Sequence, residues 1–154
     1  MSAEILKKLY YQSCCEELRA FKPGNHSIFS KIEGMCEGKF RHAAKISSEF
    51  LTDRNLSLGE SIYLSTKRCK IELNSNYNLG IIILCAPLIK ISLCGTKNFK
   101  RDLGGLLSNI TQKDGELFSK AIEFALPAGL KNYKGPGNIL NKKKISFPKM
   151  IRIS

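Results

Sequence analysis

The chain has 154 residues, a length that leaves room for one domain and little more. Its content of 43% hydrophobic and 25% charged residues is typical of a globular protein and excludes a disordered chain. The 25 Lys and Arg residues against 13 Asp and Glu residues give a net charge of +12. This excess favours a polyanionic partner, which leaves nucleic acid, an anionic membrane surface and a phosphorylated ligand as alternatives.

The cysteines and the apolar segments indicate a cellular location. Six cysteines occur without a C-x-x-C pair, and the only two histidines, His26 and His42, stand at no familiar zinc-site spacing from them. We therefore expect free thiols in a reducing compartment and no metal site built by the protein alone. The most apolar segment, residues 79–94, includes Pro87 and Lys90 and is shorter than the ~20 residues of a membrane span. Because the N-terminus also lacks the order of a signal peptide, the sequence predicts a soluble cytoplasmic protein.

Apolar residues recur at helical spacing along the first half of the chain. The first predicted helix spans residues 3–20 and ends before residues 22–25 (Lys-Pro-Gly-Asn), because proline cannot continue the hydrogen-bonding pattern of a helix. A second helix is expected over residues 40–51. A third begins at Ser57, which forms a capping-box pattern with Glu60, and runs toward residue 73.

The second half of the chain continues the helical pattern. The apolar run of residues 79–86 could be a buried strand or a buried helix, and we predict a helix because its neighbours are helical and no hairpin partner is visible. An apolar stripe predicts a helix over residues 99–110. A last helix follows the capping pattern of residues 111–114 and ends at residues 127–129 (Pro-Ala-Gly). The predicted fold class is all-α, a helical bundle.

The composition changes near residue 131. Residues 131–154 contain seven Lys or Arg residues, no acidic residue and no apolar periodicity. We therefore expect a helical domain of residues 1–130 followed by a basic, poorly ordered tail of residues 131–154. A solvated tail is favoured over a nucleic-acid-binding arm, because helix-turn-helix, zinc-finger and RNA-binding patterns are missing. A small basic helical module that binds nucleic acid stays an alternative function.

Two polar loops stand out in a sequence that has no generic nucleotide-binding, zinc-protease or hydrolase motif. Residues 17–27 lie at the end of the first predicted helix and include Lys22 and Asn25, whose side chains suit a phosphate. Residues 74–80 place asparagines directly before a predicted helix, whose N-terminal amides and dipole favour an anion. Each loop taken alone is more often a cap or a turn than a binding site.

Taken together and in order, these segments resemble the triphosphoribosyl-dephospho-CoA synthases, which prepare the prosthetic group of citrate lyase and malonate decarboxylase acyl carrier subunits. The early motif of that family is an acidic residue followed by K-P-G-N-V-H or K-P-G-N-V-S, and it corresponds to Glu17 and residues 22–27. The central motif, N-T-N-L-G-I and then A-P-L, corresponds to residues 76–81 and 86–88. The resemblance covers about residues 5–140, with weaker similarity at residues 58–62, 114–122 and 125–130.

The chain also departs from the family pattern. The family motif D-F-x-x-S-A is replaced by residues 39–44 (Lys-Phe-Arg-His-Ala-Ala), so both of its polar groups are missing, and the threonine of N-T-N is Tyr77. Family members continue with further helices, whereas this chain ends in the basic tail. We therefore expect an incomplete version of a larger all-helical domain, truncated or frame-shifted from about Asn132 or Asn141, or a naturally short variant. An apolar face left uncovered would favour self-association.

The resemblance implies a transferase that joins ATP to 3′-dephospho-CoA and releases 2′-(5″-triphosphoribosyl)-3′-dephospho-CoA and adenine, with Mg²⁺ holding the triphosphate. It implies catalytic carboxylate roles for Glu17 and Glu60, although the capping box also explains Glu60. The alternative to an active enzyme is an inactive relative that retains at most nucleotide binding. The residues implied for substrate and phosphate binding are Lys22, Asn25, His26, Asn76 and Asn78.

Overall fold

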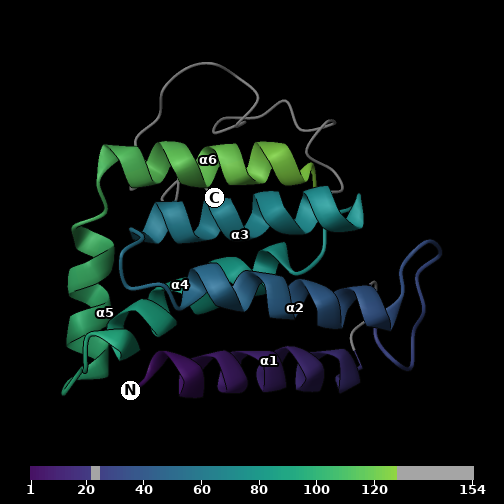
Figure 1. The fold of residues 1–154 in the computed structure, drawn as a ribbon, viewed down its shortest axis with the longest axis horizontal. Coiled ribbons are helices and arrows are strands. Elements are labelled where there is room, and N and C mark those ends of the chain that lie inside the picture. Colours follow the sequence, from purple (N-terminus) through teal and green to yellow (C-terminus); the bar gives the residue numbers. More distant parts are fainter. Residues whose placement is uncertain (22–24, 128–154) are drawn as a thin grey trace.

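The computed structural model describes residues 1–21 and 25–127, and these residues form helices and no strand (Figure 1). The all-α prediction is confirmed, including a helix rather than a strand for the apolar run after residue 78. The prediction of a basic tail and the prediction for Lys22 lie outside the described residues. The helices are α1 (Ala3–Arg19), α2 (Glu37–Leu51), α3 (Leu58–Leu73), α4 (Leu79–Leu93), α5 (Phe99–Ser108) and α6 (Gln112–Ala125).

The helices pack as a bundle in which successive long helices run in opposite directions (Figure 1). α3 lies between α2 and α6 and makes its most extensive contact with α6, while α1 packs against α2 and α4. The reversals of the chain gather five helix termini at one end of the bundle, on the right of Figure 1. These are the C-termini of α1, α3 and α6 and the N-termini of α2 and α4.

At the other end of the bundle, the N-termini of α3 and α6 are capped and joined. Both predicted capping boxes are confirmed, with Ser57 and Glu60 on α3 and with Thr111 and Asp114 on α6. Asp114 also accepts hydrogen bonds from the Ser57 hydroxyl at 2.5 Å and from the Gly59 backbone amide at 2.9 Å. A Cβ atom at Gly59 would lie 2.5 Å from the Asp114 Cα, so this close approach requires a glycine.

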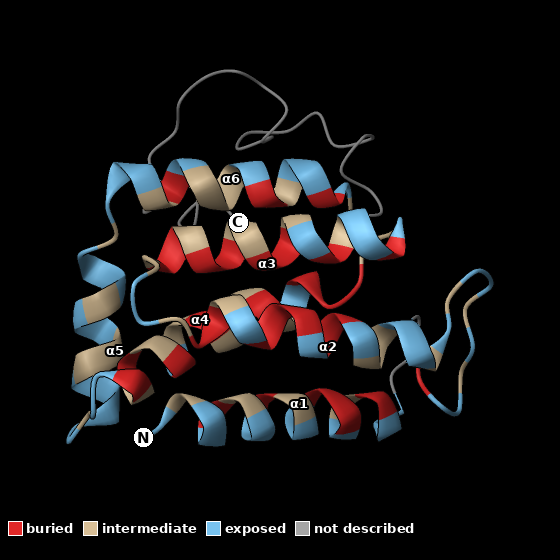
Figure 2. Cartoon of the chain, viewed as in Figure 1, coloured by how far each residue is buried: buried red, intermediate tan, exposed pale blue. Residues whose placement is uncertain are grey.

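The core lies between the helices, where their buried faces meet (Figure 2). All six cysteines are free, as expected, and Cys14, Cys15 and Cys69 are buried in this core. Burial raises the pKa of both Cys14 and Cys69 to about 12, so these thiols stay protonated near neutral pH and act as small apolar groups. The largest fully buried apolar side chains are Leu18, Leu51 and Ile82.

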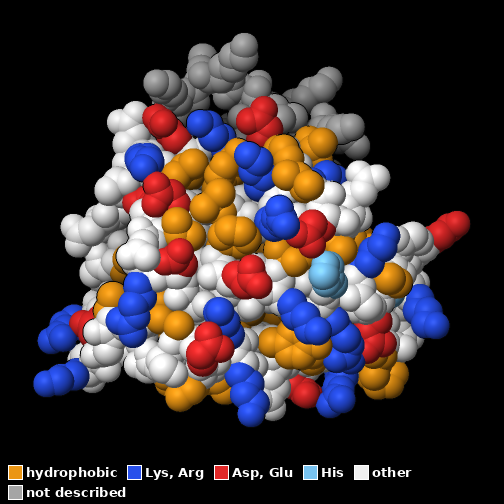
Figure 3. All heavy atoms as spheres, viewed as in Figure 1, with side chains coloured by type: hydrophobic (Ala, Val, Ile, Leu, Met, Phe, Trp, Pro, Cys, Tyr) orange, Lys and Arg blue, Asp and Glu red, His pale blue; other side chains and the backbone are white. Residues whose placement is uncertain are grey.

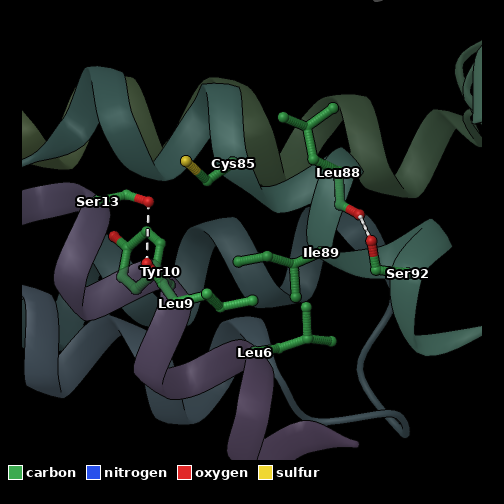
Figure 4. Close-up of a pocket in the computed structure, with 8 residues that line it drawn as sticks. All are labelled: Leu6, Leu9, Tyr10, Ser13, Cys85, Leu88, Ile89 and Ser92. Carbon is green, nitrogen blue, oxygen red and sulfur yellow. Dashed lines mark hydrogen bonds between the residues drawn. The ribbon is translucent and has the colours of Figure 1, made fainter. Parts of the chain in front are cut away.

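Several helices leave apolar side chains exposed, among them α4 and α5. α4 is apolar around its circumference, and the Leu84 side chain is 70% exposed. Beside it, a groove of about 150 Å³ separates α1 from α4, and Leu6 and Ile89 point toward each other across it (Figure 4). α5 forms as predicted but has no buried residue. Self-association through such a face stays a prediction, and no helix of the described part has the length and hydropathy that a membrane span needs.

Candidate functional site

The two polar loops singled out in the sequence lie at the same end of the bundle (Figure 1). One connects α1 to α2 and includes Asn25 and His26, and the other connects α3 to α4 and includes Asn76 and Asn78. Their positions follow from the antiparallel order of the helices, because each loop closes a helical hairpin at this end. Lys22, which the sequence analysis assigned to the same site, lies outside the described residues.

The loop after α1 folds back on itself around a buried serine. Ser27 is fully buried, and its hydroxyl oxygen accepts hydrogen bonds from the backbone amides of Phe29 at 3.2 Å and Ser30 at 3.0 Å. The backbone amide of Ile28 donates to the carbonyl of Leu18 at 3.0 Å, which ties the loop to the last turns of α1. These bonds fix the loop at the end of the helix and bring His26 inside.

His26 holds the loop against α2. Only 7% of the residue is exposed, and its Nδ1 atom accepts a hydrogen bond from the Ile32 amide at 3.2 Å. The neutral imidazole therefore carries its proton on Nε2. The ring stacks on Phe40 of α2, with 5.1 Å between the ring centroids and 11° between the planes.

The loop between α3 and α4 turns on two asparagines in the left-handed conformation. Asn74 has φ 52° and Asn78 has φ 60°, and asparagine tolerates this region better than other residues with a side chain. The Asn78 side-chain amide donates to the Phe40 carbonyl at 3.1 Å instead of capping its own helix. The first turn of α4 thus has no side-chain cap, and Gly80 within it is exposed, with open space where a Cβ would stand. An uncapped helix N-terminus of this kind suits an anion.

Phe40 joins the two loops, because residues of both loops contact it. It stacks on His26, and it meets the ring of Tyr77 edge-on, with 4.8 Å between the centroids. Tyr77 is 2% exposed, and its hydroxyl has no hydrogen-bond partner among the described residues. Burial raises the pKa of Tyr77 above its usual value. We call His26, Phe40, Tyr77 and Asn78 the loop junction.

Two residues of the loop junction, His26 and Asn78, are predicted site residues. The contacts of Phe40 and Tyr77 are not predicted by the sequence, in which these residues lie at departures from the family motifs. The predicted residues Asn25 and Asn76 stand beside the junction, the first exposed and the second half-buried. Neither the groove between α1 and α4 nor the one between α3 and α6 is lined by a residue of the loop junction.

The two predicted carboxylates are far apart. Glu17 is half-buried in the last turns of α1, at the end that carries the loop junction. Glu60 lies in the first turn of α3, about 20 Å along that helix from Asn74 at the rise of an α-helix. It accepts hydrogen bonds from Lys113 Nζ at 2.7 Å and from the Ser57 amide at 2.9 Å, and the Lys113 bond is the main cause of its lowered pKa.

Basic side chains lie near the loop junction. Lys39, which replaces the acidic residue of the family motif, is exposed in the first turn of α2, and Figure 3 shows several Lys and Arg side chains near this end of the visible face. Arg41 is held by an ion pair with Glu37 and by a contact of 3.1 Å with the Cys15 sulfur. No group of three or more His, Cys, Asp or Glu residues in the described part could hold a metal ion by itself.

The sequence match decides the family. Residues 3–153 match the family of the ATP:dephospho-CoA triphosphoribosyl transferases (CitG). The chain belongs to this family. The match confirms the resemblance and extends it from about residues 5–140 to residues 3–153. CitG membership supports a transferase of prosthetic-group biosynthesis. Neither a curated protein nor a solved structure gives a match to this chain.

Proposed function

We propose that this chain transfers the 5-triphosphoribosyl group of ATP to the 2′-hydroxyl of 3′-dephospho-CoA and releases adenine. The observation that carries the proposal is the meeting of the two family motifs at Phe40. The amide of Asn78 binds its carbonyl at 3.1 Å, and the ring of His26 stacks on it at 5.1 Å. Polar groups from two distant segments therefore flank one surface beside the open N-terminus of α4.

The reaction forms one bond and breaks another at the same carbon. The O2′ of the acceptor bonds to C1′ of the ATP ribose, and the bond from C1′ to adenine N9 breaks. Its electron pair leaves on adenine, which takes up one proton and so balances the proton that the 2′-hydroxyl loses. Positive charge develops at C1′, and the proton of the 2′-hydroxyl needs an acceptor. We assign the proton acceptor to Glu17, because it is the one of the two predicted carboxylates that lies at the loop-junction end.

The triphosphate needs donors that are rigid and partly desolvated. The backbone amides of the first turn of α4 and the positive end of its dipole provide such donors, and the Nε2 proton of His26 is a further one. Asn76 would orient a ribose hydroxyl or a phosphate oxygen beside them. The sequence assigns Lys22 to the same role.

Mg²⁺ fits this end as an ion that arrives with the nucleotide. Mg²⁺ takes oxygen ligands and is commonly held by substrate phosphates together with one or two protein groups. The described residues contain no cluster that could hold the ion alone, while the amide oxygens of Asn25 and Asn76 are hard donors beside the loop junction. When bound, the ion would neutralise the charge of the triphosphate.

The second candidate is an inactive relative that binds ATP without turnover. The observation that favours it is Lys39, which stands where the family motif has an acidic residue and lies one residue before Phe40 of the loop junction. A lysine there replaces a negative group by a positive one. Such a change favours the binding of phosphate more than proton transfer.

The deciding experiment incubates the purified chain with ATP, Mg²⁺ and 3′-dephospho-CoA and measures free adenine by chromatography. We expect adenine release that requires both substrates. Glu17→Gln should lower the rate by about 10² or more, because general-base catalysis contributes at least that factor. Glu49→Gln on exposed α2 surface is the matched control and should retain the rate.

Two outcomes would contradict catalysis. ATP binding by calorimetry without adenine release above the enzyme-free control would identify the inactive relative. The absence of measurable ATP affinity, with and without Mg²⁺, would contradict both candidates.

A further inference from the structure

The proposed function leaves one feature of the surface unexplained, the apolar face that α1 and α4 form together. Each of these two helices exposes a pair of aliphatic side chains one turn apart. The exposed fractions are 53% for Ile5 and 47% for Leu9 on α1, and 70% for Leu84 and 37% for Leu88 on α4. Leu9 and Leu88 line the groove of about 150 Å³ between the helices (Figure 4). We call these four residues the α1–α4 face.

The charges around the α1–α4 face are few and of both signs. Lys90 is the only charged residue of α4, and its Nζ donates to two backbone carbonyls of the loop between α2 and α3. On α1, Glu4 and Lys8 each precede an exposed aliphatic residue, and both are exposed. An anionic membrane or an acidic partner is attracted by basic residues, so a rim of both signs selects for neither.

The two helices of the face are level with each other in a simple register. α1 and α4 run in opposite directions and are of similar length, 17 and 15 residues (Figure 1). Across the groove, Leu6 faces Ile89. Leu9, three residues further along α1, therefore stands level with position 86 of α4, midway between the two exposed leucines of that helix.

This register makes the face complementary to itself. A half-turn about an axis along the groove exchanges the positions of the two helices, so α1 of a second copy would lie over α4 of the first. Leu9 of the second copy would then stand over the gap between Leu84 and Leu88, whose spacing of four residues leaves a hole for a side chain. The symmetry repeats this contact with the two copies exchanged, so the aliphatic pairs of both copies are covered.

We propose that the α1–α4 face binds a second copy of this chain, in a two-fold dimer in which α1 of each copy packs on α4 of the other. The removal of the exposed aliphatic side chains from water drives the association. The centre of the contact lies about 10 Å along α4 from Leu79 at the rise of an α-helix, and packed helices diverge from their point of contact. The loop junction therefore lies outside the contact, and the inference does not rest on the proposed function.

The first test measures the dissociation constant of the dimer by sedimentation equilibrium of the full chain, from micromolar to submillimolar concentration. Physiological ionic strength screens the repulsion between two copies of net charge +12. The wild type should dimerise, and Leu9→Glu or Leu84→Glu should raise the dissociation constant about tenfold or more, because each places a charge in a contact that excludes water. Ile71→Glu is the matched control, since Ile71 is 60% exposed on α3, and it should leave the constant within twofold.

A mixture of two variants tests the pairing of α1 with α4. Leu9→Glu and Leu84→Lys should each dimerise poorly alone. In a mixed dimer, one contact joins the introduced carboxylate to the introduced ammonium group, and the other contact keeps both native leucines. The mixture should therefore dimerise more tightly than either variant, as measured by sedimentation with a fluorophore on one of them. A dimer that pairs α1 with α1 and α4 with α4 would show no such recovery.

Several outcomes would overturn the inference. These are a wild type that stays monomeric at submillimolar concentration, an equal effect of Ile71→Glu, and a mixture that dimerises no better than its components. A monomeric wild type that binds vesicles of phosphatidylserine and phosphatidylcholine, and loses this binding in Leu84→Glu, would assign the face to a membrane instead. Thermal unfolding of each variant verifies that it folds, and none of these measurements depends on adenine release.

Discussion

The two ends of the bundle differ in whether their polar groups have hydrogen-bond partners within the protein. At the end where α3 and α6 begin, the carboxylates of Glu60 and Asp114 are fully engaged by caps and by each other's helix. At the end with the loop junction, the described residues provide neither a side-chain cap for the first turn of α4 nor a hydrogen-bond partner for the buried Tyr77 hydroxyl. Polar groups that are satisfied internally hold a fold together, whereas the free amides of an uncapped helix N-terminus are available to a ligand. We call the first the structural end and the second, after the proposed function, the functional end.

The largest loss of stability should come from adding a side chain at Gly59, where α3 and α6 approach each other closely. Gly59→Ala places a Cβ 2.5 Å from Asp114 Cα and 2.7 Å from its carbonyl oxygen, both of them backbone atoms that cannot move aside alone. We expect a loss of about 2–3 kcal/mol in the free energy of unfolding, measured by urea denaturation. Gly104→Ala on α5, where a Cβ meets nothing within 4 Å, should instead raise stability by about 0.5–1 kcal/mol.

Lowering the pH should reduce the free energy of unfolding, because protonation of Asp114 weakens the hydrogen bonds that join α3 to α6. The burial of Asp114 raises its pKa, but hydrogen bonds from Ser57, Thr111 and Gly59 outweigh burial and hold the pKa below its usual value. A lowered pKa in the folded state means that the carboxylate stabilises the fold above about pH 4, the usual value, and that this contribution is lost as pH falls through the folded-state pKa. Asp114→Asn should cost about 1–3 kcal/mol at pH 7 and flatten the loss of stability between pH 5 and pH 3.

The control for the acid prediction is Asp53→Asn, which removes an aspartate that accepts only a local bond from the Asn55 amide at 2.8 Å. We expect it to retain the pH dependence of the wild type. If both variants reduce the pH dependence of stability equally, net charge and not the hydrogen bonds between the caps of α3 and α6 causes the loss of stability in acid.

The capping interactions of the structural end could be predicted from the sequence because they join residues that are close together in the chain. A capping box lies within four consecutive residues, so Ser57 with Glu60 and Thr111 with Asp114 could be identified without knowledge of the packing. The bond from Gly59 to Asp114 could not, because it depends on which helices become neighbours.

The contacts of the functional end could be predicted from the sequence only in part. The order of the motifs identified His26 and Asn78, but their common contact with Phe40 depends on three helices meeting. The predicted span of the third helix already separated Glu60 from the asparagine loop, since a helix of that length keeps its two ends about 20 Å apart. The groove between α3 and α6 has no sequence pattern of its own, because its lining comes from two helices paired by tertiary packing.

At the functional end, the contribution of the Asn78 amide can be isolated from that of its backbone. Asn78→Gly keeps the left-handed conformation and removes the bond to the Phe40 carbonyl, so we expect a loss of about 1 kcal/mol in urea denaturation. Asn74→Gly is the matched control, because Asn74 shares the conformation and is exposed, and it should be near neutral. Equal effects in the two variants would contradict a role for Asn78 in joining the loops.

The smallest expected changes in stability concern two buried tyrosines, Tyr10 and Tyr77. Replacing each by phenylalanine should change stability in opposite directions. The Tyr10 hydroxyl bonds the Ser47 hydroxyl at 2.9 Å, whereas the Tyr77 hydroxyl at the loop junction has no partner in the described part. Tyr10→Phe should lose about 1 kcal/mol of stability, while Tyr77→Phe should gain up to about 1 kcal/mol, because it removes a polar atom that is buried unpaired. A loss of stability in Tyr77→Phe would show instead that the hydroxyl is already satisfied in the folded protein, and the contrast between the two ends would then rest on the open α4 terminus alone.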